Sequence, residues 1–445
     1  MTSTLTSRPG AASVRSTARR RIRVAHINAN FTAGSGGITL REALALDPDR
    51  YSSTILAPED GTLFDRAEAG GIEVVRLRRM SGGRRVYPWA DVDALKEVSS
   101  HLAAGKFDLV HTHAGRAGAF GRVAAHRLGG CAIVHTLHGF PFNEFQSPAT
   151  RLVLRSVERR LGRLTHYFLT DGTFVASEAV RLKIAPPDRV RAVISSIDGV
   201  PPASQEGRAE ARRLLGIPED AQVIGTTARL ADQKAPLDMV KAVALLRRPD
   251  VYMAWVGDGV LRPQTERMIE REGLTERFLL LGNRDDVPDL LPAFDVFAMS
   301  SLWEGLPCSV VEAMTCGIPV VATAVNSVPE VVIPGETGLL ARPADPESLR
   351  TALAYLLDHP SDAARMAENA RVRIGAQFRP ERLGPELMAV YETALSFAAV
   401  QIGREACGDR IHPRRATARR PPRRSCRRRR KGCHRSSAPR CRALA

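Results

Sequence analysis

Two carboxylates, those of Glu304 and Glu312, stand eight positions apart in a stretch whose pattern predicts a ligand-binding loop. The apolar residues 295–299 precede them and predict a buried parallel strand, and Pro307 favours the N1 position of a helix that continues through residues 309–316. One carboxylate is therefore expected on the loop at the carboxyl end of the strand, and the other in the first turns of the helix. Ligands bind in this crevice of open α/β sheets, and a helix N-terminus offers free N–H groups that suit a phosphate.

The residues around the two glutamates resemble a family signature. Glu304-Gly305-Leu306-Pro307 is followed by Glu312-Ala313-Met314 and by Gly317-x-Pro319-Val320, which together resemble the Glu-x7-Glu motif of retaining family 4 glycosyltransferases. Two glutamates at this spacing also occur on solvated helix faces, but the Gly-Leu-Pro sequence and the strand–loop–helix context favour the functional interpretation. The resemblance implies the GT-B fold, with two Rossmann-like, doubly wound parallel-sheet α/β domains that face an interdomain cleft. It also implies that Glu304 binds the hydroxyls of a donor sugar and Glu312 the ribose.

Two cations follow the first expected strand of the second half of the chain, residues 223–227. The stretch from Thr227 to Lys234 includes Arg229 and resembles the Gly-Arg-Leu-x-x-Gln-Lys-Gly segment of the same family, with Ala228 and Ala235 at positions where glycine is usual. A nucleotide sugar loses a nucleoside diphosphate, so fixed cations are needed where negative charge develops, and Arg and Lys supply a bidentate fork and a point charge. The resemblance therefore implies that Arg229, Lys234 and the helix N-terminus near Leu306 stabilise the leaving diphosphate. The alternative is a surface Arg and Lys at the start of a helix.

Further donor-binding residues are expected on three glycine-containing turns. Gly36 and Gly37 follow the first apolar strand, and we expect them to permit a positive φ and a close approach of the backbone to the donor phosphates. A plain strand-to-helix turn is the alternative there. Gly257 resembles the turn of the family beside the donor, and Arg284 lies in a stretch that resembles the one whose backbone faces the base.

Histidines follow two of the expected strands of the first half. His138, in the segment His-Gly-Phe-Pro, resembles the N-domain histidine of the family that contacts the transferred sugar, whereas His111, His113 and His135 are expected to be structural. A metal site is the alternative for these side chains, but the resemblance implies no metal and no other cofactor. The pair Asp91-x-Asp93 imitates the metal-binding motif of other transferases, but it opens an amphipathic pattern and is interpreted as a solvated helix face.

Strand and helix patterns alternate through two stretches of the chain, which predicts two parallel, doubly wound sheets. We expect a disordered basic N-terminus (1–21), an acceptor domain (22–200), a nucleotide-sugar domain (209–379), a helix that crosses back to the first domain (380–403) and a disordered Arg-rich tail (404–445). A Pro-, Gly- and Ser-rich linker at 198–208 separates the domains.

Composition indicates an ordinary globular protein, with 445 residues, 44% of them hydrophobic and 25% charged. The net charge of +16 is concentrated at the ends: residues 1–23 contain six Arg and no acid, and residues 404–445 contain sixteen Lys or Arg and two acids. Such ends are expected to be disordered, and they could bind anionic lipid or nucleic acid. The remaining chain is slightly acidic, so nucleic acid is not expected as a partner of the folded part.

Three cysteines in the expected folded part, and no apolar run of signal-peptide or transmembrane length, predict a cytoplasmic protein. Residues 75–89 and 151–164 combine Arg with apolar side chains. Such stretches lie on anionic membranes or turn an apolar stripe to the core, and peripheral association with the inner face of the plasma membrane is kept as an expectation.

We therefore predict a retaining, metal-independent hexosyltransferase of polysaccharide or glycoconjugate biosynthesis. Its donor is a nucleotide diphosphate sugar, with a UDP-sugar favoured, and its acceptor a glycan or a polyprenyl-diphosphate-linked sugar. The alternatives are a nucleotide-sugar epimerase of the same fold, a glycosidase, whose mechanism has no use for the two cations, and a nucleic-acid-binding protein acting through its basic ends.

Overall fold

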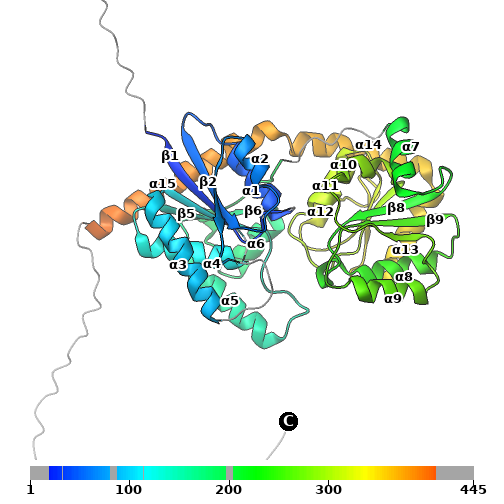
Figure 1. The fold of residues 1–445 in the computed structure, drawn as a ribbon, viewed down its shortest axis with the longest axis horizontal. Coiled ribbons are helices and arrows are strands. Elements are labelled where there is room, and N and C mark those ends of the chain that lie inside the picture. Colours follow the sequence, from blue (N-terminus) through cyan, green and yellow to red (C-terminus); the bar gives the residue numbers. More distant parts are fainter. Residues whose placement is uncertain (1–19, 33, 81–87, 114, 197–203, 407–445) are drawn as a thin grey trace, which may run out of the picture. The chain divides into compact units, whose positions relative to one another are not determined.

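The computed structural model describes residues 20–32, 34–80, 88–113, 115–196 and 204–406 (Figure 1). The disorder expected for residues 1–21 and 404–445 falls almost entirely outside these ranges, as do Arg84 and Arg85 of the first basic stretch. No helix among the described residues is long and apolar enough to cross a bilayer.

The first sheet has seven parallel strands in the order β3-β2-β1-β4-β5-β6-β7. Its strands are β1 (Ile22–Asn28), β2 (Tyr51–Pro58), β3 (Glu73–Leu77), β4 (Leu109–His113), β5 (Ala132–Leu137), β6 (Tyr167–Thr170) and β7 (Val190–Ala192). The helices between them are α1 (Ser35–Leu44), α2 (Phe64–Ala69), α3 (Pro88–Gly105), α4 (Gly115–Leu128), α5 (Pro148–Gly162), α6 (Thr173–Arg181) and the short η1 (Pro187–Arg189).

Helices cover both faces of this sheet because successive side chains of a strand point to opposite faces. Ala25 and Ile27 of β1 pack against α3 and α4. Val24 points the other way, into a core completed by Leu387 and Tyr391 of α15 (Pro380–Ala406), the orange helix of Figure 1. The last described helix of the chain therefore packs on its first sheet.

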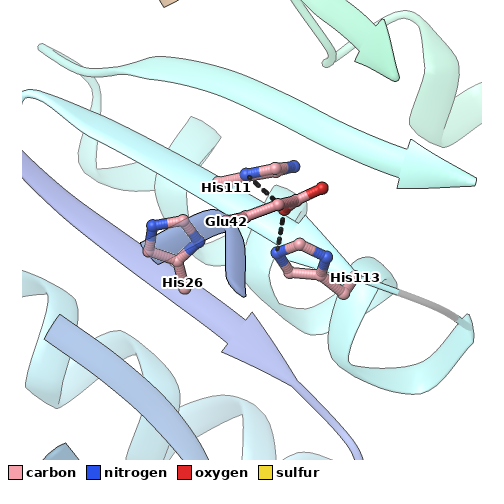
Figure 2. Close-up of side chains that lie close together, drawn as sticks. All are labelled: His26, Glu42, His111 and His113. Carbon is pink, nitrogen blue, oxygen red and sulfur yellow. Dashed lines mark ion pairs between the residues drawn. The ribbon is translucent and has the colours of Figure 1, made fainter. Parts of the chain in front are cut away.

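Polar side chains interrupt the core on the α15 side of the sheet. His26 of β1, His111 and His113 of β4 and Glu42 of α1 lie close together (Figure 2), each at most 2% exposed. Such a group in an apolar interior must be compensated by partners or by a ligand.

The second sheet has six parallel strands in the order β10-β9-β8-β11-β12-β13. Its strands are β8 (Gln222–Thr227), β9 (Val251–Val256), β10 (Phe278–Leu280), β11 (Val296–Met299), β12 (Val320–Thr323) and β13 (Leu339–Ala341). The helices around it are α7 (Gln205–Leu215), η2 (Asp232–Lys234), α8 (Pro236–Leu246), α9 (Arg262–Arg271), α10 (Val287–Leu290), η3 (Leu291–Ala293), α11 (Cys308–Thr315), α12 (Val328–Val331), α13 (Pro346–Asp358) and α14 (Pro360–Gln377).

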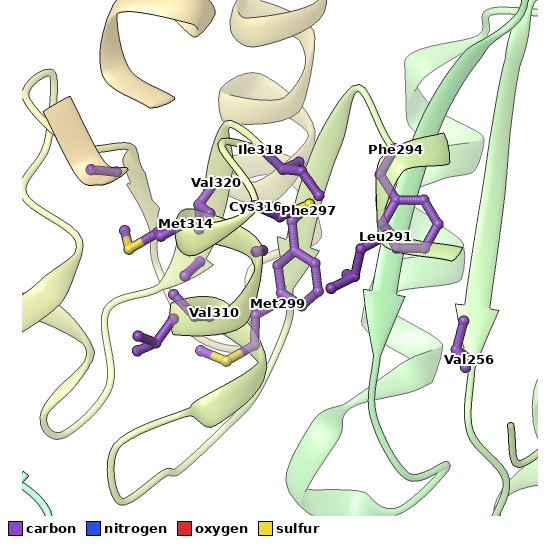
Figure 3. Packing of buried hydrophobic residues seen from close by; sticks show 14 of the residues in the cluster. Val256, Leu291, Phe294, Phe297, Met299, Val310, Met314, Cys316, Ile318 and Val320 are labelled. Carbon is purple, nitrogen blue, oxygen red and sulfur yellow. The ribbon is translucent and has the colours of Figure 1, made fainter. Parts of the chain in front are cut away.

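The packing of α11 on this sheet fixes the helix that carries Glu312. Phe297 and Met299 of β11 belong to one buried cluster with Val310 and Met314 of α11 (Figure 3). All four are at most 3% exposed. The helix is therefore held by a close-packed apolar face, and its N-terminus stays at the carboxyl end of the strand.

Each sheet reverses its strand order once, between β1 and β4 in the first and between β8 and β11 in the second. Ligands of open α/β sheets bind outside the carboxyl ends of the strands at such a switch point. The segment that leaves β8 carries Arg229 and Lys234, the loop that leaves β11 carries Glu304, and α11 after that loop carries Glu312. The edge strands β7 and β13, three residues each, were not predicted from the sequence patterns.

Candidate functional site

The switch point of the second sheet pairs a predicted cation with a predicted carboxylate. Lys234 Nζ lies 2.5 Å from Glu304 Oε1, and the two side chains are 16% and 6% exposed. Gln233 donates from Nε2 to the Trp303 carbonyl at 2.9 Å and to Glu304 Oε2 at 3.3 Å. The backbone N–H of Glu304 donates to Asn326 Oδ1 at 2.8 Å. The loop from β8 thus fixes both oxygens of the Glu304 carboxylate.

Ala235, at the end of this loop, explains why glycine is usual in the resembling segment. It has φ 44° and ψ 56°, the left-handed region, and is the residue from which α8 begins. The left-handed conformation costs an L-residue roughly 1–2 kcal/mol, and the small side chain of Ala keeps this cost at the low end of the range.

Helix α11 begins one residue later than expected, at Cys308, with Pro307 at the N-cap and not at N1. A proline side chain cannot cap a helix, so N–H groups of the first turn remain for a ligand. Burial and, to a smaller extent, the charge of Glu312 raise the pKa of Cys308 to about 12, against the opposing charges of Arg41 and Lys234. Charged groups from both domains therefore lie around this helix N-terminus.

The other predicted site residues of the second domain are Arg229, Gly257 and Arg284, and both arginines are more exposed than the two residues of the ion pair. Arg229 is exposed, and its Nη2 lies 3.5 Å from Gln233 Oε1. A Cβ on Gly257, which has φ 127°, would lie 2.2 Å from the Ala228 carbonyl oxygen, so this turn needs glycine to pack against the loop from β8. Arg284 is exposed and forms an ion pair with Asp286, which a donor would have to compete with.

His138, which follows β5, has both ring nitrogens engaged. Nδ1 lies 2.9 Å from Asp171 Oδ2, and Nε2 lies 3.3 Å from His113 Nδ1. Burial lowers the pKa of His138, but the charge and hydrogen bond of Asp171 and the charge of Glu42 outweigh it, so its pKa is raised. A Cβ on Gly305 would lie 2.4 Å from the His138 carbonyl oxygen, so only glycine permits this approach between the loops after β11 and β5.

The expectation of positive φ at Gly36 and Gly37 is wrong. The positive φ, 66°, belongs to Gly34, the residue before α1, whereas Gly36 and Gly37 lie inside the helix. A Cβ on Gly36 would lie 2.8 Å from the Asn30 carbonyl oxygen, so Gly36 is needed where the helix contacts its own loop. The turn itself takes its positive φ at Gly34, the N-cap residue, whose carbonyl accepts the first helical hydrogen bond, from the N–H of Ile38 at 3.1 Å.

A cavity of about 850 Å³ collects residues of both domains. Of the predicted site residues, its lining includes His138, Glu304 and Gly305 but not Arg229, Lys234 or Glu312. Aromatic side chains from the segment after β5, among them Phe142 and Phe145, and Arg151 of α5 line it further. Ligand pockets of proteins usually have volumes of about 300–1,000 Å³, so this cavity is large enough to hold a sugar together with part of a second ligand.

Sequence reasoning missed Asp171, which orients His138. It follows β6 directly, and the argument used for histidines after strands would have found it.

Asp91 and Asp93 lie in α3 and form ion pairs with Arg116 and Lys96, in agreement with a solvated face. His26, Glu42, His111 and His113 could hold a metal ion, with one ligand atom of each within 4.8 Å of the others.

Comparisons with known proteins identify both domains. Residues 207–373 match the family described as Glycosyl transferases group 1, and residues 33–195 match the Glycosyl transferase 4-like domain. The D-inositol 3-phosphate glycosyltransferase of Salinispora arenicola is 31% identical over 66% of this chain and 70% of its own length. This chain belongs to the glycosyltransferase group 1 family.

Other relatives of this glycosyltransferase agree. An Escherichia coli UDP-Gal:alpha-D-GlcNAc-diphosphoundecaprenol alpha-1,3-galactosyltransferase is 27% identical over 76% of this chain and 88% of its own length. The crystal structure of Anabaena Alr3699/HepE in complex with UDP and glucose superposes with a TM-score of 0.73 at 21% identity, covering 84% of this chain and all of that one. The GT-B fold and the glycosyltransferase activity expected from the motif are confirmed, and the epimerase alternative has no support.

Proposed function

We propose that this glycosyltransferase moves a sugar from a nucleotide diphosphate sugar, a UDP-sugar in the first instance, to a sugar carried on a polyprenyl diphosphate, with retention at the anomeric carbon. The single observation that carries the acceptor is the wall of the cavity. Glu304 and His138 line the cavity together with Arg151, Leu152 and Arg155 of α5. An acceptor with an anionic diphosphate and an apolar chain matches this combination of charge and apolar surface.

The outer face of α5 supports the same acceptor. Leu152 is 56% exposed, Val153 60% and Val157 39%, next to the basic residues of the helix. The sequence suggested an apolar stripe along this helix, but its side chains do not share one environment: Leu161 is buried, whereas Val157 is exposed to solvent. A helix with exposed apolar and basic side chains lies on anionic membranes, which would bring the cavity to a lipid-linked acceptor. The proposed location is the cytoplasmic face of such a membrane.

On the donor side, Lys234, Arg229 and the α11 N-terminus are proposed to stabilise the leaving diphosphate, with Glu304 on the donor sugar and Glu312 on the ribose. Gly36, Gly37, Gly257, Gly305 and Leu306 shape the donor site through their backbones, and Arg284 lies beside the base. His138 is proposed to contact the reacting sugar. Since these groups already supply positive charge, we propose that transfer needs no metal ion at the diphosphate.

A donor and acceptor matrix tests the proposal. UDP-, GDP- and ADP-sugars are compared by thermal shift, since a donor at 100 times its Kd stabilises the protein by about 2.7 kcal/mol. Purified protein is then assayed with the stabilising donor and either a polyprenyl-diphosphate-linked sugar or inositol phosphate, without added metal and in EDTA. Transfer to the lipid-linked acceptor with an anomerically retained product supports the proposal, whereas transfer only to inositol phosphate would reject it.

Membrane association has its own test in vesicle co-sedimentation. Full-length protein is expected to sediment with anionic vesicles at low salt and to lose most of this binding when Leu152 and Val153 are changed to Gln. The matched control is Val372→Gln, because Val372 is 62% exposed on α14 of the other domain. Deleting residues 404–445 separates a contribution of the basic tail, including any binding of nucleic acid, from that of α5.

A further inference from the structure

The buried polar group of the first domain has a geometry that the sheet dictates. In the parallel pair β1–β4, His26 is in register with His111, and Asn28 with His113. His111 and His113 are two residues apart on one strand, so both point to the face that carries His26. Helix α1 brings Glu42 over this face, as Figure 2 shows. Three strand positions and one helix position thus converge on a single point.

Four of the eight polar side-chain atoms at this point have no hydrogen-bond partner in the described part of the chain. Both ring nitrogens of His26, Oε2 of Glu42 and Nε2 of His113 lack a hydrogen-bond partner among the described residues. All three side chains are at most 3% exposed. Buried polar atoms in folded proteins are nearly always satisfied, so an unmet group of this size indicates a missing ligand.

The distances fit a metal ion. Oε2 of Glu42 lies 3.6 Å from Nδ1 of His111 and 3.7 Å from Nε2 of His113. Zinc bonded tetrahedrally to nitrogen and oxygen at about 2.0–2.2 Å holds its ligand atoms roughly 3.4 Å apart. Small movements of the side chains would therefore complete such a site.

The surrounding hydrogen bonds also fit, since a ligating histidine normally donates its other ring N–H to a partner. Nε2 of His111 lies 2.7 Å from Thr136 Oγ1. Nδ1 of His113 lies 3.3 Å from Nε2 of His138, whose other nitrogen contacts Asp171. With a metal on the inner nitrogens, Nε2 of His111 would carry the proton and donate it to Thr136 Oγ1, and Nδ1 of His113 would donate to Nε2 of His138 in its neutral form.

One contact opposes metal binding. The Tyr391 hydroxyl lies 2.7 Å from His111 Nδ1, and a metal on that nitrogen would replace this hydrogen bond. A metal-free network would keep this bond, but it would leave His26 without any partner.

We propose that His26, His111, His113 and Glu42 bind a divalent transition-metal ion of the zinc class. The four protein ligands close the coordination sphere, so the ion is structural and ties α1 to β1 and β4. Glu42 binds as the carboxylate, and any proton it carries is released to solvent. The existence of the site does not depend on the proposed acceptor.

The test uses metal content and spectra of the full-length protein. Protein freed of metal with a chelator is reconstituted with ZnSO4 or CoCl2 and desalted. One equivalent of metal should remain, and Co²⁺ should show the intense visible bands of a tetrahedral ion without a thiolate charge-transfer band. The absence of that band separates this site from the cysteines of residues 407–441. Failure of the wild-type protein to retain metal would overturn the proposal.

Matched variants locate the ion. Glu42→Gln and His26→Asn should each reduce retained metal at least tenfold, whereas His135→Asn should retain one equivalent. His135 is the control because it is equally buried but has partners at Thr112. If the variants fold poorly, X-ray absorption of the zinc-loaded wild type decides: only nitrogen and oxygen neighbours are expected, and sulfur neighbours would reject the site.

Discussion

The ammonium of Lys234 and the carboxylate of Glu304 are hydrogen-bonded to each other at 2.5 Å. The family resemblance implies different roles for them, Lys234 at the donor diphosphate and Glu304 at the donor sugar, yet the structure holds them as one unit. A lysine has three donor hydrogens, so Lys234 can keep Glu304 in place and still contact an anionic oxygen of the donor.

The first prediction concerns this pair. Lys234→Met and Glu304→Gln should each reduce kcat/KM by about 10²–10³, the usual loss when one charge-stabilising group is removed. The double variant should lose little more than either single variant, because the two side chains act together. Steady-state kinetics measure the three values, and Lys241→Met on the exposed face of α8 is the control. Fully additive losses would show that the two residues act independently.

The second prediction concerns the approach of Gly305 to His138. Gly305→Ala would place a methyl group 2.4 Å from a backbone oxygen, so the loops must separate. We expect a loss of turnover of at least tenfold and a lower melting temperature. Gly375→Ala is the matched control, because its Cβ meets nothing within 4 Å in α14 and should stabilise that helix by about 1 kcal/mol. Unchanged activity of Gly305→Ala would mean that the close approach is dispensable.

A third prediction uses the thiols. Burial raises the pKa of Cys308 to about 12 and that of Cys131 to about 11, so both are protonated at pH 8. Since only the thiolate reacts, alkylation of the native protein should be on the order of 10²–10³ times slower than that of a free thiol and should accelerate as pH rises towards 11. Mass spectrometry of peptides gives both rates, with the urea-unfolded protein as reference. Rapid labelling of Cys308 at pH 8 would show that the α11 N-terminus outweighs burial.

The fourth prediction concerns the attachment of α5. Arg122 Nη2 lies 2.9 Å from Glu158 Oε2, and the side chains are 0% and 5% exposed. Glu158→Ala leaves the buried guanidinium uncompensated, which should destabilise the protein by about 3–5 kcal/mol in denaturant unfolding. The control, Glu210→Ala, breaks a solvent-exposed pair with Arg213 and should leave the midpoint unchanged. Equal effects of the two substitutions would contradict a role for burial.

Sequence patterns predicted candidate site residues where a chemical motif stands next to an expected strand. The loops after β8 and β11 were singled out because Arg229, Lys234 and Glu304 lie in segments that follow apolar runs and resemble motifs of the family. The partners that orient them were not found: Lys234 and Glu304 are 70 residues apart, and His138 and Asp171 are 33 apart. Such pairs depend on strand order, and spacing along the chain does not encode it. The conformation of the first glycine loop was misplaced by two residues because several glycines there permit the same turn.

The packing of α15 on the first sheet has a consequence for biosynthesis. Leu387 and Tyr391 fill the same cluster as Val24 and Leu109, although more than 270 residues separate the two sets. During translation, the first strands leave the ribosome long before the helix that covers them is made. The core of the second domain is completed by α14, whose Ala370 and Ile374 pack on it, so this domain can fold before α15 is made. The N-terminal domain then waits with an uncovered apolar face, in the interval when a newly made chain is most prone to aggregate and most in need of a chaperone.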